Sequence, residues 1–137
     1  MGIAENKQVV RRFFEEAING RDPKLGEQLL APEFRDHDPV PGEPAGPQAG
    51  RHIVEFLHHA YGSPQFAFDI LIGEGDLVAG RWTLKAVDAY GTGGRPATGK
   101  PFTETGIAIF RVSHGRISER WAVVDRLGVL RQLGHAG

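Results

Sequence analysis

The chain has 137 residues, 40% of them hydrophobic, with 16 Lys or Arg against 17 Asp or Glu and a formal net charge of −1. This balance lacks the basic excess of a nucleic-acid surface, and no apolar run approaches the roughly 20 residues that span a bilayer. The sequence holds no cysteine, which excludes disulfides and thiolate metal sites. We therefore expect one domain, 1–137, located in the cytoplasm, because the first residues lack the segments of a signal peptide.

The first half of the chain has the period of helices. Apolar side chains recur at helical spacing over 5–18, between Lys, Arg and Glu, which predicts an amphipathic helix. Asp22 followed by Pro23 is typical of the start of a short second helix. A third helix is expected over about 51–61. The segment 39–50 before it is rich in Pro and Gly and is long for a loop, so it is either a lid or disordered.

The second half changes to the period of strands. A short extended segment is expected at 33–39, and 65–91 then reads as two strands joined by a Gly-Glu-Gly-Asp turn. The stretch 92–100 is a flexible crossover. A long hairpin over 101–125 turns at Ser-His-Gly, and 126–134 is a short helical or irregular tail.

This order predicts an α+β fold. We expect a curved antiparallel sheet packed by three helices, with a conical cavity between the layers. Such a cavity is a natural site for a small molecule.

Six segments carry a family resemblance that spans nearly the whole chain: "VVRRFFEEAINGRD", "LAPEFRDHDP", "GRWTL", "ATGKPFT", "GIAIFRVSHGRISERWAVVD" and "LGVLRQLG". Their order and spacing resemble SnoaL-like polyketide cyclases of the nuclear transport factor 2-like superfamily, which also contains ketosteroid isomerases and limonene epoxide hydrolases. The resemblance implies an α+β cone, no metal, no organic cofactor and a homodimer that pairs through the sheet. Fold alone does not fix the reaction.

The resemblance also implies where an acid–base pair should lie. In aromatic polyketide cyclases an aspartate follows the place of Trp121 on the last strand, and a histidine sits opposite it on the preceding strand. Here those places hold Ala122 and Ala108. A methyl group transfers no proton, so other residues must take over any chemistry.

Two candidates for that chemistry are His37 and Glu104. The resemblance places His37 at the pocket mouth, and its neighbours Asp36 and Asp38 would favour its charged form; the alternative is a solvated loop residue. Glu104 shares strand parity with Ala108 unless a bulge intervenes. A cavity-facing Glu104 would have a raised pKa, whereas the alternative is an exposed glutamate at a sheet edge.

A third candidate and four binding residues remain. Asp125 either bends toward the pocket as a catalytic carboxylate or caps the terminal helical turn. Trp82, Tyr90 and Trp121 are expected to form the walls of a flat apolar site, although strand aromatics are more often plain core. Arg120 would hold an anionic or enolate oxygen, against the alternative of a solvated strand arginine.

We therefore predict an acid–base enzyme that needs no cofactor and acts on a small apolar or aromatic metabolite, with His37 and Glu104 as the favoured catalytic pair. Cyclisation, isomerisation of an enolisable ketone and epoxide opening would all fit. No metal is expected, because His52 and Glu55 lack a third ligand in pattern. A non-catalytic carrier of a hydrophobic ligand and a dimeric interaction domain are the alternatives.

Overall fold

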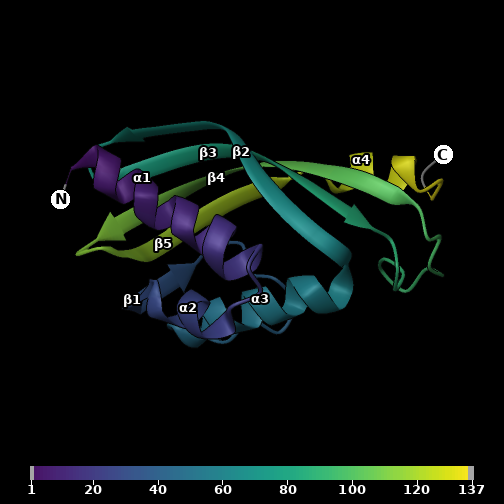
Figure 1. The fold of residues 1–137 in the computed structure, drawn as a ribbon, viewed down its shortest axis with the longest axis horizontal. Coiled ribbons are helices and arrows are strands. Elements are labelled where there is room, and N and C mark those ends of the chain that lie inside the picture. Colours follow the sequence, from purple (N-terminus) through teal and green to yellow (C-terminus); the bar gives the residue numbers. More distant parts are fainter. Residues whose placement is uncertain (1, 136–137) are drawn as a thin grey trace.

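A strongly bent five-stranded sheet covers the helices of the amino-terminal half (Figure 1). The computed structural model describes residues 2–135. Its elements are α1 (Ile3–Arg12), the π-helical turn η1 (Phe13–Ile18), α2 (Pro23–Gln28), β1 (Leu30–Asp36), α3 (Gln48–Ala60), β2 (Gly62–Glu74), β3 (Leu77–Val87), β4 (Pro101–Ser113), β5 (Arg116–Val124) and α4 (Arg126–Gln132). No helix within the described residues is both long and apolar enough to cross a membrane.

The predicted α+β fold is confirmed, with two differences in detail. The strand order is β1-β5-β4-β3-β2, and β1 pairs with β5 in parallel, so the sheet is mixed. Hairpins force the other neighbours to be antiparallel, whereas β1 reaches its neighbour only through α3 and three further strands. The carboxyl-terminal tail also forms a proper fourth helix, α4, at the end of the sheet (Figure 1).

The expected first helix changes its geometry halfway along. Its last turns widen into η1, where Asn19 N donates to Phe14 O at 2.8 Å and Asp22 N to Ala17 O at 2.8 Å. The Asn19 side chain then binds both backbone groups of Phe66 on β2, at 2.8 and 2.9 Å. Such π-helical turns are rare and frequently mark functional sites.

Residues of β4 alternate cleanly between the two faces of the sheet. Glu104, Ala108 and Phe110 are buried on the inner face, while Ile107 and Ile109 are 56% and 40% exposed on the outer face. The pairing of β4 with β3 runs without a break, so no bulge reverses this alternation. The predicted shared face of Glu104 and Ala108 is therefore confirmed.

Helices α2 and α3 touch at a pair of glycines. A Cβ on Gly50 would lie 2.0 Å from the carbonyl oxygen of Gly26, and a Cβ on Gly26 would lie 2.7 Å from that of Gly50. Backbone therefore meets backbone at this crossing, and no side chain can move to make room.

Replacing Gly50 with alanine is expected to lower the free energy of unfolding by about 1–3 kcal/mol, because the new methyl group must push the helices apart. Urea unfolding measures the change. Glu55→Ala, an exposed position on the same helix, is the control and should stay within about 0.5 kcal/mol of wild type. Equal stability of Gly50→Ala and wild type would contradict this packing.

Candidate functional site

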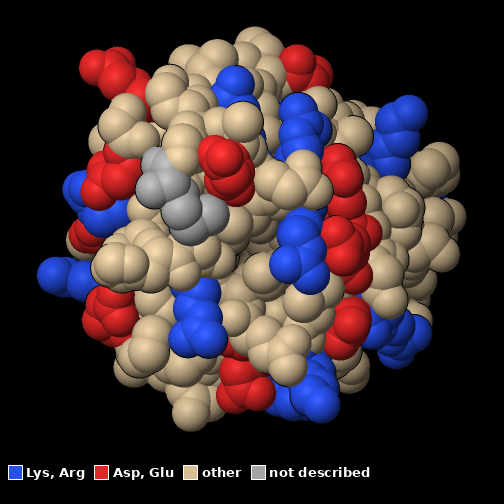
Figure 2. Space-filling model, turned by 60° about the vertical axis from the view of Figure 1, so that its left-hand side comes forward, with Lys and Arg blue, Asp and Glu red and all other residues tan. Residues whose placement is uncertain are grey.

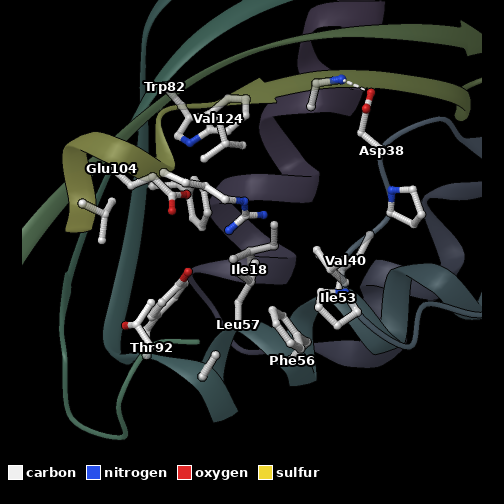
Figure 3. A pocket seen from close by; sticks show the side chains of 18 of the residues that line it. Ile18, Asp38, Val40, Ile53, Phe56, Leu57, Trp82, Thr92, Glu104 and Val124 are labelled. Atoms are coloured by element: carbon white, nitrogen blue, oxygen red, sulfur yellow. Dashed lines mark hydrogen bonds between the residues drawn. The ribbon is translucent and has the colours of Figure 1, made fainter. Parts of the chain in front are cut away.

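The inner face of the sheet and the helices enclose a cavity of about 630 Å³ (Figure 3). Its walls are mostly apolar and come from η1, α3 and the strands; they include Phe14, Ile18, Ile53, Leu57, Trp82 and Val124. Polar side chains reach it at separate places, Glu104, Tyr61 and Arg126 forming one group and Asp38 with Arg120 another. In Figure 3 Glu104 and Asp38 lie on opposite sides of the cavity.

Glu104 presents a carboxyl group to this apolar space. It is 7% exposed, and its pKa is raised above the ordinary value of 4.5 mainly by burial. The positive charge of Arg126 opposes that rise, and the negative charge of Asp125 adds to it. A carboxylate with little hydration and a raised pKa is a stronger base than an exposed one.

Tyr61 faces the same region from the end of α3. Burial raises the pKa of its phenol, the negative charge of Glu104 raises it further, and Arg126 lowers it. The phenol therefore keeps its proton at neutral pH and can donate a hydrogen bond. Sequence reasoning missed Tyr61 as a site residue, although its place at the end of an apolar helix face, directly before Gly62, was a usable signal.

Arg120 is held by hydrogen bonds on the other side of the cavity. Its Nη1 atom donates to both oxygens of Asp36 at 3.0 and 3.1 Å and to the carbonyl oxygen of Asp38 at 3.0 Å. The Asp36 side chain is 2% exposed and that of Arg120 is 16% exposed. Asp38 in turn accepts a hydrogen bond from Ala122 N at 2.8 Å. The guanidinium is thus hydrogen-bonded and largely buried, unlike the solvated surface arginine that was the alternative.

Glu43, in the Pro/Gly-rich loop, adjoins this group. Its Oε1 atom accepts from Val40 N at 3.2 Å. Burial, a hydrogen bond with the Asp36 carboxylate and the charge of Asp36 raise the pKa of Glu43 to about 8, although Arg120 opposes the shift. Glu43 therefore carries a proton at neutral pH that ties the loop to the end of β1. No local pattern in the loop sequence pointed to this pairing.

The structure places His37 and Trp121 on the outer face, away from the cavity. His37 Nε2 lies 2.7 Å from a carboxylate oxygen of Glu119, and its ring stacks on Trp121 at 4.8 Å between centroids. Strand alternation is the cause, because inward-facing Asp36 and Asp38 leave the residue between them facing outward. We therefore retain neither the catalytic role predicted for His37 nor the ligand contact predicted for Trp121.

Three further predicted site residues lie in three different parts of the structure. Asp125 takes the capping role, since its Oδ1 atom accepts from Gly128 N at 2.8 Å, and its charge still reaches Glu104. Tyr90 is 66% exposed and does not line the cavity. Trp82 is 3% exposed and lies in the cavity wall as predicted; whether it contacts a ligand stays a prediction.

The crossover loop between β3 and β4 borders the cavity and is tied down at its base. Asp88, 1% exposed, accepts hydrogen bonds from Thr98 N at 2.9 Å, Thr98 Oγ1 at 2.8 Å and Thr92 Oγ1 at 3.3 Å. Burial tends to raise the pKa of Asp88, but these bonds outweigh it and leave the pKa below its ordinary value. Thr92 and Arg95 of this loop line the cavity.

Metal-ligating side chains do not gather in the part of the chain that the structure describes. No three His, Asp or Glu side chains among residues 2–135 converge in a way that could hold an ion. On the face shown in Figure 2, Lys and Arg alternate with Asp and Glu, so the described residues there form no patch of a single charge.

Comparisons with known proteins agree with this fold and cavity. A family model described as SnoaL-like polyketide cyclase matches residues 8–133, so the chain belongs to that family. It is 30% identical over 135 residues to the aklanonic acid methyl ester cyclase DnrD of Streptomyces peucetius, a match covering 92% of this chain and 88% of the relative. The corresponding cyclase DauD of Streptomyces sp. (strain C5) is also 30% identical, with 92% and 80% covered.

Solved structures give the same result. TsrD from Streptomyces laurentii superposes with a TM-score of 0.86 at 29% identity, covering 98% of both chains. IdmH from Streptomyces antibioticus superposes with a TM-score of 0.81 at 28% identity, covering 94% of this chain and 98% of the other. Within this fold, Ala108 and Ala122 are direct cross-strand partners on the inner face. The two places that the resemblance gives to the acid–base pair are therefore adjacent here and carry only methyl groups.

The proton on Glu43 predicts a specific pH dependence of stability. A folded-state pKa of about 8 against 4.5 means that this contribution to stability is full below pH 4.5 and is lost as the pH rises through 8. Glu43→Gln keeps a neutral side chain, so its melting temperature should gain on that of wild type from pH 4.5 to above 8. Glu55→Gln, at an exposed carboxylate, should run parallel to wild type. Parallel curves for Glu43→Gln as well would contradict the shared proton.

Proposed function

We propose that this protein is a polyketide cyclase that closes a ring in a small, largely apolar polycyclic ketone by acid–base chemistry of its own side chains. The observation that carries the proposal is Glu104, a buried carboxyl group with a raised pKa in an apolar cavity of about 630 Å³. The family and the two relatives named as aklanonic acid methyl ester cyclases support the reaction class.

The proposed step begins with proton removal. The Glu104 carboxylate takes a proton from a carbon next to a ketone, and the C–H electron pair becomes an enolate. The enolate carbon then forms a bond to a second carbonyl carbon of the same molecule, whose π electrons become an alkoxide. That alkoxide takes the proton back from Glu104, so the step is balanced and returns the enzyme to its starting state.

The neighbouring groups suit the charges that develop. Tyr61 keeps its proton and can donate to the oxygen on which negative charge forms, and Arg126 supplies a positive charge on the same side of the cavity. Arg120, held by Asp36, would bind an oxygen of the substrate at the far side. Fixed donors of this kind stabilise the transition state without having to reorganise.

Glu104→Gln is expected to lower kcat about 10²–10⁴-fold, because the amide cannot accept the proton. The assay supplies aklanonic acid methyl ester to the full chain in deuterium oxide and follows both ring closure and deuterium uptake by mass spectrometry. Substrate affinity should change less than about threefold, since the side-chain shape is kept. The matched control is Glu119→Gln on the outer face, which should keep wild-type turnover.

Stability measurements test whether misfolding is the reason for any loss of turnover in Glu104→Gln. Because the folded-state pKa of Glu104 lies above 4.5, ionised Glu104 destabilises the fold, and this penalty grows as the pH rises through the folded-state pKa. Glu104→Gln should thus be at least as stable as wild type at pH 7. Full turnover in Glu104→Gln would contradict the proposed step, and binding by wild type without exchange or ring closure would favour the carrier alternative.

We also propose that the protein forms a homodimer through the outer face of the sheet. Two rows of cross-strand neighbours there contain apolar side chains, namely Ile70, Ile107 and Val123 in one row and Ile72, Ile109 and Trp121 in the other; all of these are exposed except Trp121, which is partly buried. The ion pairs Arg81–Asp69 and Arg111–Asp76 lie on the same face. A second copy related by a two-fold axis would cover the apolar rows and bring opposite charges together.

Val123, 77% exposed in the first row, tests the dimer. Val123→Lys should convert the wild-type dimer to a monomer in sedimentation velocity, because the interface would bury a charge that has no partner. Leu127→Lys on α4, at a residue 51% exposed, serves as the control and should stay dimeric. A wild-type protein that sediments as a monomer contradicts the proposal.

A further inference from the structure

The indole nitrogen of Trp82 has no hydrogen-bond partner. Trp82 lies in the cavity wall and is 3% exposed, and its Nε1 atom is inaccessible to solvent. No acceptor among residues 2–135 meets this N–H group. A buried donor that has lost water and gained no acceptor is unfavourable, and such groups in native proteins call for an explanation.

The indole fits in this place because the residue opposite it, Gly106, has no side chain. Gly106 pairs directly with Trp82 across β3 and β4, and a Cβ on Gly106 would lie 2.2 Å from the Cζ2 atom of the indole. Phe14 of η1 stacks beside the ring, at 6.3 Å between centroids and 29° between planes. The indole thus occupies the space that a side chain at position 106 would need.

The orphan donor belongs to a residue on the same side of the cavity as the proposed base. Glu104 lies two residues before Gly106 on β4, on the same inner face. Figure 3 shows Trp82 and Glu104 at the same side of the cavity. A ketone whose neighbouring carbon faces Glu104 would therefore have its oxygen at the side of the cavity where the indole lies.

We propose that the Trp82 N–H group donates a hydrogen bond to a ketone oxygen of the substrate, on which negative charge forms when Glu104 removes the proton. The inference rests on the proposed function and deepens it, because it assigns Trp82 a role in specificity as well as a place in the wall. Ligand binding must displace the atoms that now cover Nε1. A ligand without an oxygen at this position leaves the donor buried and unpaired, so the site selects for ketones.

The test uses the fact that the chain has two tryptophans, one inside the cavity and one on the outer face. Full-length protein labelled with ¹⁵N-tryptophan gives two indole N–H signals, which Trp82→Phe and Trp121→Phe assign. The probes are anthraquinone-2-sulfonate and anthracene-2-sulfonate, which share outline and charge and differ in the two carbonyl oxygens. We expect the quinone to move the Trp82 proton signal downfield and to leave that of Trp121 in place, while the anthracene leaves the Trp82 signal within a small ring-current shift.

Affinity gives the second measurement. Trp82→Phe keeps an aromatic wall and removes the donor, so it should weaken quinone binding about fivefold and leave anthracene binding nearly unchanged. Equal losses for both probes, quinone binding without a downfield shift, or no quinone binding at all would each overturn the inference. Any of these results together with loss of turnover in Glu104→Gln would leave the proposed function standing, whereas full turnover in Glu104→Gln would remove the proposed function itself.

Discussion

The chemistry that this fold can perform depends on the burial of one carboxyl group among apolar walls. A carboxylate loses hydration when it leaves water, and the pKa of Glu104 rises for that reason. The positive charge of Arg126 partly compensates the cost of this burial. Tyr61 has a raised pKa from the same burial and from the same neighbour. A single desolvated region thereby holds a carboxyl group that can act as a base and a phenol that can donate a hydrogen bond.

The rest of the molecule positions that region. The bend of the sheet and the wide turn at η1 leave the cavity open, and the Asn19 side chain fastens the end of η1 to β2. Asp88 fixes the base of the crossover loop, while Glu43 and Asp36 fix the Pro/Gly-rich loop. A carboxyl group thus holds each of the two loops at the cavity in place. The pKa values of these groups shift in opposite directions, since that of Asp88 is lowered and that of Glu43 is raised.

Much of the fold could be predicted from the sequence because the spacing of hydrophobic residues indicates which face of a helix or strand is buried. Alternation along β4 predicted that Glu104 shares a face with Ala108, and the unbroken pairing with β3 confirmed it; the alternation alone left open whether that face lines a cavity. The same alternation, applied to β1, places His37 on the outer face. The catalytic role predicted for His37 relied instead on the carboxylates that flank it and did not consider which face of the strand it lies on. Glu43 was missed as a site residue because its role comes from contacts with segments distant in sequence, which no local pattern records. Tyr61 was missed although its place at the end of an apolar helix face was a usable signal. Asp125 was ambiguous for a different reason, since a strand end has no fixed parity and only the observed cap at Gly128 decides it.

The two alanines at the expected acid–base positions carry only methyl groups, so any proton transfer in this cavity needs another residue. Our account places it at Glu104, and the most direct measurement is the titration of that carboxyl group. Carbon-13 NMR of glutamate-labelled protein, with Glu104→Gln to assign the signal, follows the carboxyl carbon against pH. We predict a midpoint clearly above 4.5 that rises further in Arg126→Met, because the compensating positive charge is then gone. A midpoint at or below 4.5 would show a hydrated carboxylate and would contradict the central claim.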